Sequence, residues 1–463
     1  MQPSLTLPGG GLPPRPPAPP GQFLIGNLLP FKRDMLGFLA NTRAELGDVF
    51  RVRLGKRSLF IFSHPDVAEQ VLIKERDSFG KLAELGGEVR GLPLVLGRGL
   101  VVNFGESWKR QRQMMQPIFH KTQIALMATA MTDAGTRLLD RWQQRYAPSA
   151  QIDVAQEMMR VTVDIVSQTM FGSDLLDRTD ELGKSFTALL RYAFASFTNP
   201  LMPPPRWPTP GNRHFRRMLG QLDEMIYEVV DRRVQSRVLH GDLLDMLLAA
   251  RDDASGEGMP IRQLRDEIAT IFGAGHETTA NALTWAFYLL SLHPDAAARL
   301  RAELAQVLGG RTPVFDDLAR LSYTRAVFEE SMRLYPPAPV LPRAVMRDTT
   351  VGGYLMRHGD RTMTNVHLIH RHPAYWEAPE RFDPARFLPP QSDVARHRCA
   401  YLPFGAGPRV CIGNHFAMME GQLLLAQILQ RYRLTLVPGH PVEAEVAVTM
   451  RPRHGMRMTL QPV

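Results

Sequence analysis

The sequence contains very few cysteines: two in 463 residues, Cys399 and Cys411. A chain of this length with two cysteines has no disulfide framework, which fits a reducing compartment and predicts a cytoplasmic protein. Long apolar runs are also missing, since no window approaches the roughly 18 apolar residues that span a bilayer. The N-terminal stretch lacks the charged and apolar regions of a signal peptide. We therefore expect no integral membrane segment.

Charge of one sign is not concentrated in any block. Lys and Arg number 55 against 46 Asp and Glu, which gives a net charge of +9. The basic residues are scattered, and no ladder of alternating basic and aromatic residues is present. This distribution argues against nucleic acid as a partner and leaves an acidic protein or an anionic surface.

Helical patterns dominate the chain and predict a mostly α fold with small β-sheets. Residues 1–22 are rich in Pro and Gly and predict a disordered leader. Residues 49–62 alternate around a Gly-Lys pair, as a β-hairpin does. The longest helical pattern begins at Pro260 and ends near Leu292. A last helix is expected over 412–432, after short strands within 340–365, and a strand-like segment ends the chain. Residues 23–463 are expected to form a single domain.

The segment FGAGPRVCIG places Cys411 at the start of the last predicted helix. Unpaired amide groups and the positive helix dipole favour a thiolate there. Gly405 and Gly407 permit a tight turn with positive φ, and Arg409 adds a positive charge. Such a cysteine can be a metal ligand, a nucleophile or an inert buried residue. Zinc is disfavoured, because no CxxC or HxxxH companion is present.

The segment AGHETT, which starts at Ala274, lies in the middle of the longest predicted helix. Gly273 and Gly275 each cost about 1 kcal/mol in a helix interior. They therefore indicate the close approach of a flat ligand or of a neighbouring helix. The Thr278 hydroxyl can bond the carbonyl of Ala274, four residues back, and so open a polar notch in the helix. Glu277 supplies a titratable group beside this notch.

Two pairs of residues at helical spacing are further candidate site residues, although each pattern alone is common. Glu330 and Arg333 lie three residues apart on one face of a predicted helix, where they can pair. Trp108 and Arg112 lie one helical turn apart, and an indole N–H with a guanidinium suits a carboxylate ligand.

Together, these segments resemble the cytochrome P-450 superfamily over residues 20–460. The residues at 404, 407, 409, 411 and 413 match every fixed position of its haem-binding signature. AGHETT resembles its oxygen-activation motif. The segments W-x-x-x-R (108–112), E-x-x-R (330–333) and P-E-R-F (379–382) also follow the family's pattern, and all of these segments occur in the family's order. The resemblance implies the cytochrome P-450 fold, with haem between a long central helix and the C-terminal helix that follows the cysteine loop.

The resemblance also implies a role for each matching residue. Cys411 is expected to ligate the iron of haem b, and Thr278 with Glu277 to deliver protons to dioxygen. Expected propionate partners are Trp108, Arg112, Arg343 and Arg409; further haem contacts are Phe404, Gly407, Gly413, Ala274 and Gly275. A buried structural network is expected from Glu330, Arg333 and Arg381. Expected substrate-pocket residues are Leu92, Val95, Phe272, Ala274, Ala338, Val340, Leu341 and Met450.

These assignments predict a monooxygenase that inserts one atom of dioxygen into an apolar fatty acid, terpenoid, steroid or macrolide-like molecule. Electrons are expected from NAD(P)H through a separate ferredoxin or flavodoxin-like protein, attracted to the basic residues Lys109, Arg110, Arg112, Arg409 and His415. A monomer is expected. The alternatives are a peroxide-driven peroxygenase, in which Arg-Pro replaces the acid–alcohol pair, and a non-catalytic haem-binding sensor.

Overall fold

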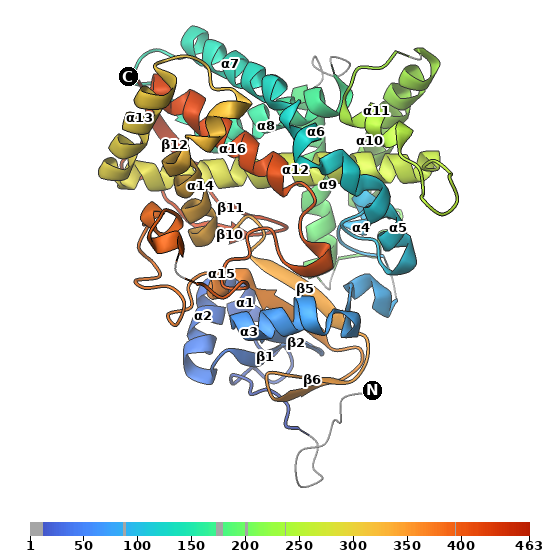
Figure 1. Cartoon of the computed structure of the whole chain (residues 1–463). Helices are drawn as coiled ribbons and strands as arrows, with labels where there is room; N and C mark the ends of the chain where they lie inside the picture. The colour runs from blue at the N-terminus through green and yellow to red at the C-terminus, as the bar shows by residue number, and fades with distance from the viewer. Residues whose placement is uncertain (1–12, 87–88, 173–178, 200–201, 237, 394) are drawn as a thin grey trace. The chain divides into compact units, whose positions relative to one another are not determined.

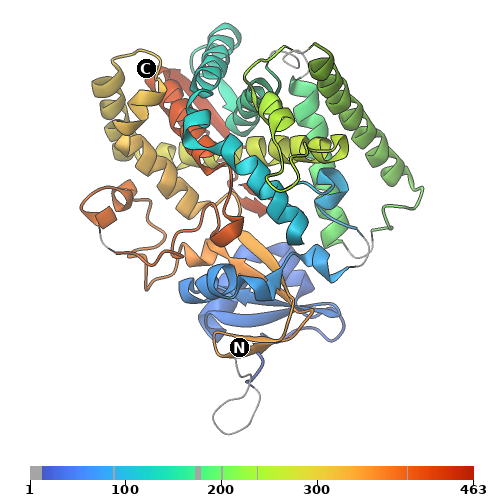
Figure 2. The ribbon, with the colours of Figure 1, turned by 45° about the vertical axis from the view of Figure 1, so that its right-hand side comes forward.

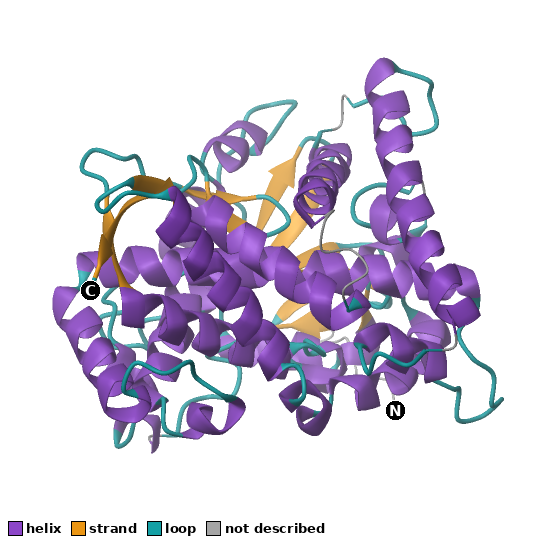
Figure 3. Cartoon of the chain, turned by 90° about the horizontal axis from the view of Figure 1, so that it is seen from above, coloured by secondary structure: helices purple, strands orange, loops and turns teal. Residues whose placement is uncertain are grey.

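The computed structural model describes residues 13–86, 89–172, 179–199, 202–236, 238–393 and 395–463. They form two compact units. Unit 1 takes its residues from the ranges 1–87, 333–382 and 392–411, and unit 2 from 88–332, 383–391 and 412–463. Helices dominate and the strands form small sheets (Figure 3), which confirms the predicted fold class.

Unit 1 is built on a five-stranded sheet that joins distant parts of the chain. Its strand order is β1–β2–β8–β5–β3, so the early strands β1 and β2 lie beside the late strands β8 and β5 (Figure 2). The strands are β1 (Val49–Leu54), β2 (Arg57–Phe62), β3 (Phe79–Gly80), β5 (Val340–Val345) and β8 (Arg361–Asn365). Leu54 pairs with Arg57 across the turn at Gly55, which confirms the predicted hairpin.

Short elements cover this sheet. They are α1 (Leu28–Arg33), α2 (Met35–Leu46), α3 (Pro65–Glu69), η1 (Gln70–Lys74), η2 (Arg76–Ser78), η3 (Leu82–Leu85), α15 (Val366–Ile369), η9 (Gly407–Arg409) and the hairpin of β6 (Thr349–Val351) and β7 (Tyr354–Met356). Buried apolar side chains of α3, η1, β2 and β5 form one core with Cys399 and Leu402. The chain that leads to Cys411 is therefore anchored in this core.

Part of the leader is attached to unit 1. Arg15 forms an ion pair with Asp360 at 2.6 Å, and its guanidinium lies over the ring of Phe60. The carbonyls of Pro14 and Pro17 accept backbone hydrogen bonds from unit 1. These contacts differ from the disorder expected throughout the leader, because an extended proline-rich strand still offers carbonyls and one long cation. Residues 1–12 lie outside the described residues.

Unit 2 is mostly helical. Its helices include α4 (Pro93–Leu96), α5 (Gly105–Met115), η4 (Gln116–Phe119), α6 (Lys121–Ala125), α7 (Ala128–Arg145), α8 (Val154–Phe171), α9 (Thr179–Thr198), α10 (Pro210–Ser236), α11 (Leu243–Ala249), α12 (Ile261–Leu292), α13 (Pro294–Leu308), η6 (Phe315–Ala319), η7 (Pro384–Phe387) and α16 (Asn414–Arg431). Its strands are β4 (Gln151–Asp153), β9 (Tyr432–Leu436), β10 (Ala444–Val446), β11 (Met450–Pro452) and β12 (Arg457–Pro462). Helix α14 (Ser322–Leu334) begins in unit 2, and its last two residues belong to unit 1.

Helix α12 is the longest element, with 32 residues. At about 1.5 Å per residue it extends roughly 48 Å, and Figure 1 shows it running across the other helices of unit 2. It packs against α8, α10 and α16, its Phe272 contacts Phe186 of α9, and most of its residues are buried. Its predicted start after Pro260 and its end at Leu292 are confirmed.

Candidate functional site

Cys411 stands at the end of a loop of unit 1, exposed at the surface of that loop. Its backbone N–H donates to the carbonyl of Phe404 over 2.9 Å, which closes residues 404–411 into a compact turn. Helix α16 begins three residues later, at Asn414, with Gly413 as its N-cap. The prediction that Cys411 lies in the first helical turn is therefore wrong. The reason is that Gly413 adopts a non-helical backbone, with ψ of 17°, and delays the helix.

Glycines shape this loop as predicted. Gly405 and Gly407 both have φ of +72°, a conformation that L side chains rarely adopt. A Cβ at Gly407 would lie 2.1 Å from the carbonyl oxygen of Leu72 in η1. At Gly413, by contrast, a Cβ would meet nothing within 4 Å. Gly407 is thus required by the protein's own packing, and Gly413 is not.

Three cations of unit 1 lie close to one another. Lys81, Arg343 and Arg409 repel one another electrostatically, and Glu84 is the carboxylate that faces all three. Burial, then Arg343 and Arg409, lower the pKa of Lys81 to about 7. Burial and Arg409 lower the pKa of Arg343 to about 10, and burial lowers that of Arg409. We call these four residues the cation group.

Two of these cations, Arg343 and Arg409, were predicted from sequence, and Lys81 with Glu84 was missed. Arg343 is buried on β5, opposite Thr362 of β8, so it is not the solvated strand residue that a surface strand would carry. Lys81 precedes η3 and donates its backbone N–H to Glu84 over 2.6 Å. A lysine and a glutamate three residues apart give no local signal, because only the fold brings them to Arg343.

His370 joins the end of α14 to the cysteine loop and was also missed. Its Nδ1 lies 3.2 Å from the carbonyl of Arg333, and its Nε2 accepts from the backbone N–H of Leu402 over 2.7 Å. The Arg333 guanidinium donates to the carbonyls of His370 and Arg381 and lies over the ring of Trp376. Arg333 is therefore a buried residue that joins the segments around His370, Trp376 and Arg381 of unit 1.

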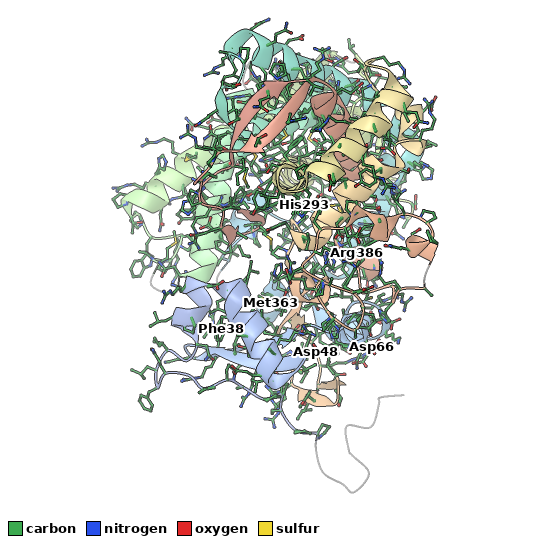
Figure 4. All side chains as sticks on the ribbon, turned by 90° about the vertical axis from the view of Figure 1, so that its left-hand side faces the viewer. Phe38, Asp48, Asp66, His293, Met363 and Arg386 are labelled. Carbon is green, nitrogen blue, oxygen red and sulfur yellow. The ribbon has the colours of Figure 1, made fainter. Side chains whose placement is uncertain are left out.

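Two members of the predicted network, Glu330 and Arg333, are fully buried. Glu330 accepts from the backbone N–H of Asp383 over 2.8 Å. Arg386, which is buried too (labelled in Figure 4), forms an ion pair with Glu330 at 3.5 Å and was not predicted. The third predicted member, Arg381, is exposed and supplies its carbonyl to Arg333. The part that the Arg381 side chain plays in the network stays a prediction.

In unit 2, the middle of α12 forms the predicted notch. The Thr278 hydroxyl donates to the carbonyl of Ala274 over 2.7 Å. Ala274 is exposed although it lies in the middle of a buried helix. The notch therefore combines an accessible small residue with a hydroxyl whose oxygen lone pairs can still accept.

Glu277 is buried rather than solvated. Its Oε1 accepts from the Thr449 hydroxyl over 2.8 Å, and Thr449 in turn accepts from the Asn281 side chain over 3.0 Å. Neither Thr449 nor Asn281 was predicted. Asn281 lies four residues after Glu277 on the same helix face, which is a local signal, whereas Thr449 is brought there from 172 residues away.

The glycines of α12 serve helix packing. A Cβ at Gly273 would lie 2.4 Å from the ring of Phe186 in α9, and one at Gly275 would lie 3.1 Å from Val166 in α8. An added Cβ at either glycine would therefore point at a neighbouring helix, and a cofactor contact of the Gly275 backbone stays a prediction. Of the two sequence-based explanations, contact between helices accounts for both glycines.

The predicted substrate-pocket residues differ in exposure. Val95, Phe272 and Met450 are buried in the interior of unit 2. Phe272 packs against Phe186 and lines a small apolar cavity with residues of α8, α9 and α10. Leu92 in unit 2 and Ala338, Val340 and Leu341 in unit 1 are partly exposed, and Ala274 in unit 2 is exposed. The contact of these residues with a substrate stays a prediction.

Trp108 and Arg112 lie one turn apart on α5 of unit 2, and both side chains are half-buried. On the same helix, Lys109 forms an ion pair with Glu106 at 2.6 Å and Arg110 with Asp252 at 3.3 Å. His415 is exposed at the start of α16. The basic residues predicted to attract an acidic donor are thus present, and two of them are partly neutralised.

Unit 1 also gathers histidines and carboxylates into two groups. One group is Asp48, His64 and His372; the other is Asp66, Glu69 and His397 (Asp48 and Asp66 are labelled in Figure 4). In all three histidines, Nδ1 accepts the backbone N–H two residues later, so in the neutral ring the hydrogen is on Nε2. A metal would need a nitrogen lone pair, and Nδ1 already uses its own. These groups are hydrogen-bonded clusters of the fold rather than metal sites.

Within the part of the chain that the structure describes, no helix is both long enough and apolar enough to cross a bilayer.

Comparison with known proteins identifies the family. The family model "Cytochrome P450" matches residues 16–456. "Cyclooctatin synthase" of Streptomyces melanosporofaciens is 35% identical over 449 residues, covering 96% of this chain and 94% of that protein. "Cyclooctat-9-en-7-ol 5-monooxygenase" of the same organism is 34% identical, covering 91% and 90%. "Pentalenene oxygenase" of Streptomyces avermitilis is 31% identical, covering 96% of each.

A solved structure gives the same answer for the fold. The chain superposes on the haem domain of cytochrome P450DA with a TM-score of 0.87 and 24% identity, covering 97% of this chain and 98% of the other. With the sequence signature, the glycine-shaped cysteine loop and the notch of α12 in place, the chain belongs to the cytochrome P450 family of haem-dependent oxidoreductases.

Proposed function

We propose that this protein is a haem-thiolate monooxygenase that inserts one atom of dioxygen into an apolar terpene-derived molecule, with electrons from a separate protein. The observation that carries the proposal is the exposed Cys411 at the end of a loop that belongs to the same unit as the cation group. In this proposal the Cys411 thiolate would hold the haem iron, and Cys399 would not. Burial raises the pKa of the Cys399 thiol to about 11, so it stays protonated.

The chemistry of the donor set fits haem. Lys81, Arg343 and Arg409 bring three positive charges together when Lys81 is protonated, and Glu84 offsets one of them. Two propionates carry two negative charges, so we propose that Lys81, Arg343 and Arg409 bind them, together with Trp108 and Arg112. Phe404 and Gly407 then support the ligand loop. Haem held by a thiolate supplies the oxidising chemistry, since the sulfur pushes electron density that favours O–O cleavage.

In this proposal, residues of α12 carry protons to the haem site and line the space beside it. The Thr278 hydroxyl donates its one hydrogen to the Ala274 carbonyl. Its oxygen can therefore only accept a further hydrogen bond, and in this way it would orient a proton-bearing group. Glu277 is the titratable group beside it and is the proposed proton source. Ala274 is exposed beside the notch, and in this proposal it would contact the haem and a substrate. The acid–alcohol pair, rather than Arg-Pro, is why we propose an electron-driven enzyme and not a peroxygenase.

The proposed substrate class rests on the relatives and on the character of the walls. Three relatives of 31 to 35% identity are named for cyclooctatin, cyclooctatenol and pentalenene chemistry. The partly exposed predicted wall residues are aliphatic: Leu92, Ala338, Val340 and Leu341. Aliphatic walls with few polar groups suit a compact polycyclic hydrocarbon or alcohol. The cytoplasmic location stays a prediction from cysteine content.

The proposed electron donor is an acidic ferredoxin or flavodoxin-like protein. Arg110, Lys109 and His415 are exposed, and the chain carries a net charge of +9. Complementary charge raises the association rate, and salt screens it. Turnover at low donor concentration is therefore expected to fall as ionic strength rises, and turnover independent of salt would argue against this donor class.

Labelled oxygen tests the proposed function. The purified haem protein is screened optically against cyclic terpene hydrocarbons and alcohols, and each ligand found is incubated with a ferredoxin system under ¹⁸O₂. The proposal predicts a product with one ¹⁸O atom, formed only with reductant. Product oxygen derived from water, or equal turnover with peroxide alone, would contradict it.

A further inference from the structure

The β10–β11 hairpin of unit 2 is docked along one face of α12. Glu277, Asn281 and Trp285 lie four residues apart and therefore share that face. Glu277 and Asn281 both bond to the Thr449 hydroxyl, and the Trp285 indole N–H lies 3.4 Å from the carbonyl of Met450. Thr449 immediately precedes β11, so the hairpin turn places the Thr449 hydroxyl against α12.

The direction of these hydrogen bonds is fixed by chemistry. An amide nitrogen can only donate, so Asn281 Nδ2 donates to Thr449 Oγ1 over 3.0 Å. The one hydrogen of Thr449 then goes to Glu277 Oε1 over 2.8 Å. Such a chain is cooperative, because a donor that itself receives a hydrogen bond becomes a stronger donor. It ends on the carboxylate, where a hydrogen bond is worth most.

We propose that Thr449 is a positioning residue for Glu277: its hydroxyl, supported by Asn281, fixes the carboxylate beside the notch of Thr278. This inference rests on the proposed function, in which Glu277 is the proton source. All three members are buried, so no bulk water replaces the Thr449 hydroxyl when it is removed.

The hairpin turn that carries Thr449 also fixes the position of its hydroxyl relative to Glu277. The backbone N–H of Ala447 donates to the carbonyl of Thr449 over 3.0 Å, which holds the turn closed. Val446 pairs with Met450 across the hairpin, so the register places the hydroxyl one residue before β11. A side chain of the same shape without a hydroxyl would keep the turn and lose only the bond to Glu277.

Thr449→Val and Thr449→Ser separate the hydroxyl from the packing. In haem-loaded protein with a confirmed substrate, Thr449→Val is expected to lower kcat about tenfold, the value of one hydrogen bond to a charged group. KM is expected to stay unchanged, and Thr449→Ser to restore kcat to within about twofold. In a Glu277→Gln background, Thr449→Val is expected to add less than about twofold, because the two changes remove one interaction.

Infrared spectroscopy tests the same bond without turnover. The carboxylate stretch of Glu277, assigned by subtraction of the Glu277→Gln spectrum, is expected to shift in Thr449→Val and to return in Thr449→Ser. An unshifted band, a Thr449→Ser variant as impaired as Thr449→Val, or full additivity with Glu277→Gln would overturn the proposal. If the wild-type protein forms no oxygenated product, the proposed function fails, and the infrared result still decides whether Thr449 holds Glu277.

Discussion

The hydroxyl of Thr278 donates a hydrogen bond of 2.7 Å to the carbonyl oxygen of Ala274, one turn earlier in α12. The bond ties the hydroxyl's only hydrogen to the helix and leaves its oxygen as an acceptor toward the exposed surface at Ala274. It also removes the need for a second side chain to fix the orientation of Thr278. An acceptor held in this way can orient a proton donor, which is the role we propose for it.

Removal of the Thr278 hydroxyl should lower the fraction of electrons that is used to form product. Thr278→Ala is expected to keep its haem and to lower the product formed per electron pair by about five- to tenfold, since one hydrogen bond of about 1 kcal/mol is lost. The remaining electrons should appear as hydrogen peroxide. The measurement is product and peroxide per NAD(P)H consumed. Thr278→Ser keeps the hydroxyl and serves as control, and unchanged coupling in Thr278→Ala would remove Thr278 from the proton path.

Gly407 and Gly413, two glycines of the haem-binding signature, should differ in how far substitution by alanine destabilises the protein. Gly407→Ala introduces a Cβ 2.1 Å from the Leu72 carbonyl at a φ of +72°, and is expected to cost about 2–5 kcal/mol. Gly413→Ala meets nothing within 4 Å at a negative φ and should leave the free energy of unfolding nearly unchanged. Denaturant unfolding of the two variants compares them directly. Equal destabilisation would show that the loop packs differently from this structure.

Lys81 should make haem retention depend on pH. Without an anionic ligand its pKa is about 7, lowered by burial and then by Arg343 and Arg409. A bound propionate would raise this pKa, because an opposite charge favours the protonated form. The contribution of Lys81 to haem affinity is therefore complete below about pH 7 and is lost as the pH rises above it.

The measurement is the rate of haem transfer to an acceptor protein at several pH values. Lys81→Met should speed transfer by about tenfold at neutral pH, the loss of one charge-assisted hydrogen bond, and should remove the Lys81 share of the pH dependence. Lys81→Arg keeps its charge at high pH and should retain haem there better than the wild type. Identical pH profiles for all three proteins would exclude Lys81 from propionate binding.

The buried ion pair of Arg386 with Glu330 provides a test of the network. Arg386→Met removes a positive charge that pairs with the fully buried Glu330, and is expected to lower the free energy of unfolding by about 3–5 kcal/mol. Arg386→Lys keeps the charge and serves as the control, with a smaller expected loss. Urea unfolding of both variants gives the comparison. A loss below about 1 kcal/mol in Arg386→Met would show that the ion pair does not stabilise the fold.

Features governed by local rules could be predicted from the sequence. The β1–β2 hairpin follows from alternation around Gly55, and α12 follows from Pro260, the apolar period and His293-Pro294. The positive φ angles of Gly405 and Gly407 and the bond from Thr278 to Ala274 each involve residues no more than four apart. Steric limits on the backbone and hydrogen bonds between nearby residues determine such features, so they depend little on distant parts of the chain.

Features made by distant residues could not be predicted in this way. Lys81 reaches Arg343 only because β3 pairs with β5, and Thr449 reaches Glu277 only because the hairpin docks on α12. Gly273 and Gly275 gave a clear signal of close approach, but the sequence could not say whether a ligand or a helix approaches. The ion pair between Arg386 and Glu330 likewise depends on how η7 turns.

The most direct test of the account is the absorption spectrum of the reduced protein with carbon monoxide, measured for the wild type, Cys411→Ala and Cys399→Ala. We expect a thiolate-type spectrum for the wild type and for Cys399→Ala, and its loss in Cys411→Ala. A thiolate-type spectrum that persists in Cys411→Ala, or a wild-type spectrum typical of iron held by nitrogen, would contradict the assignment on which the proposed function depends.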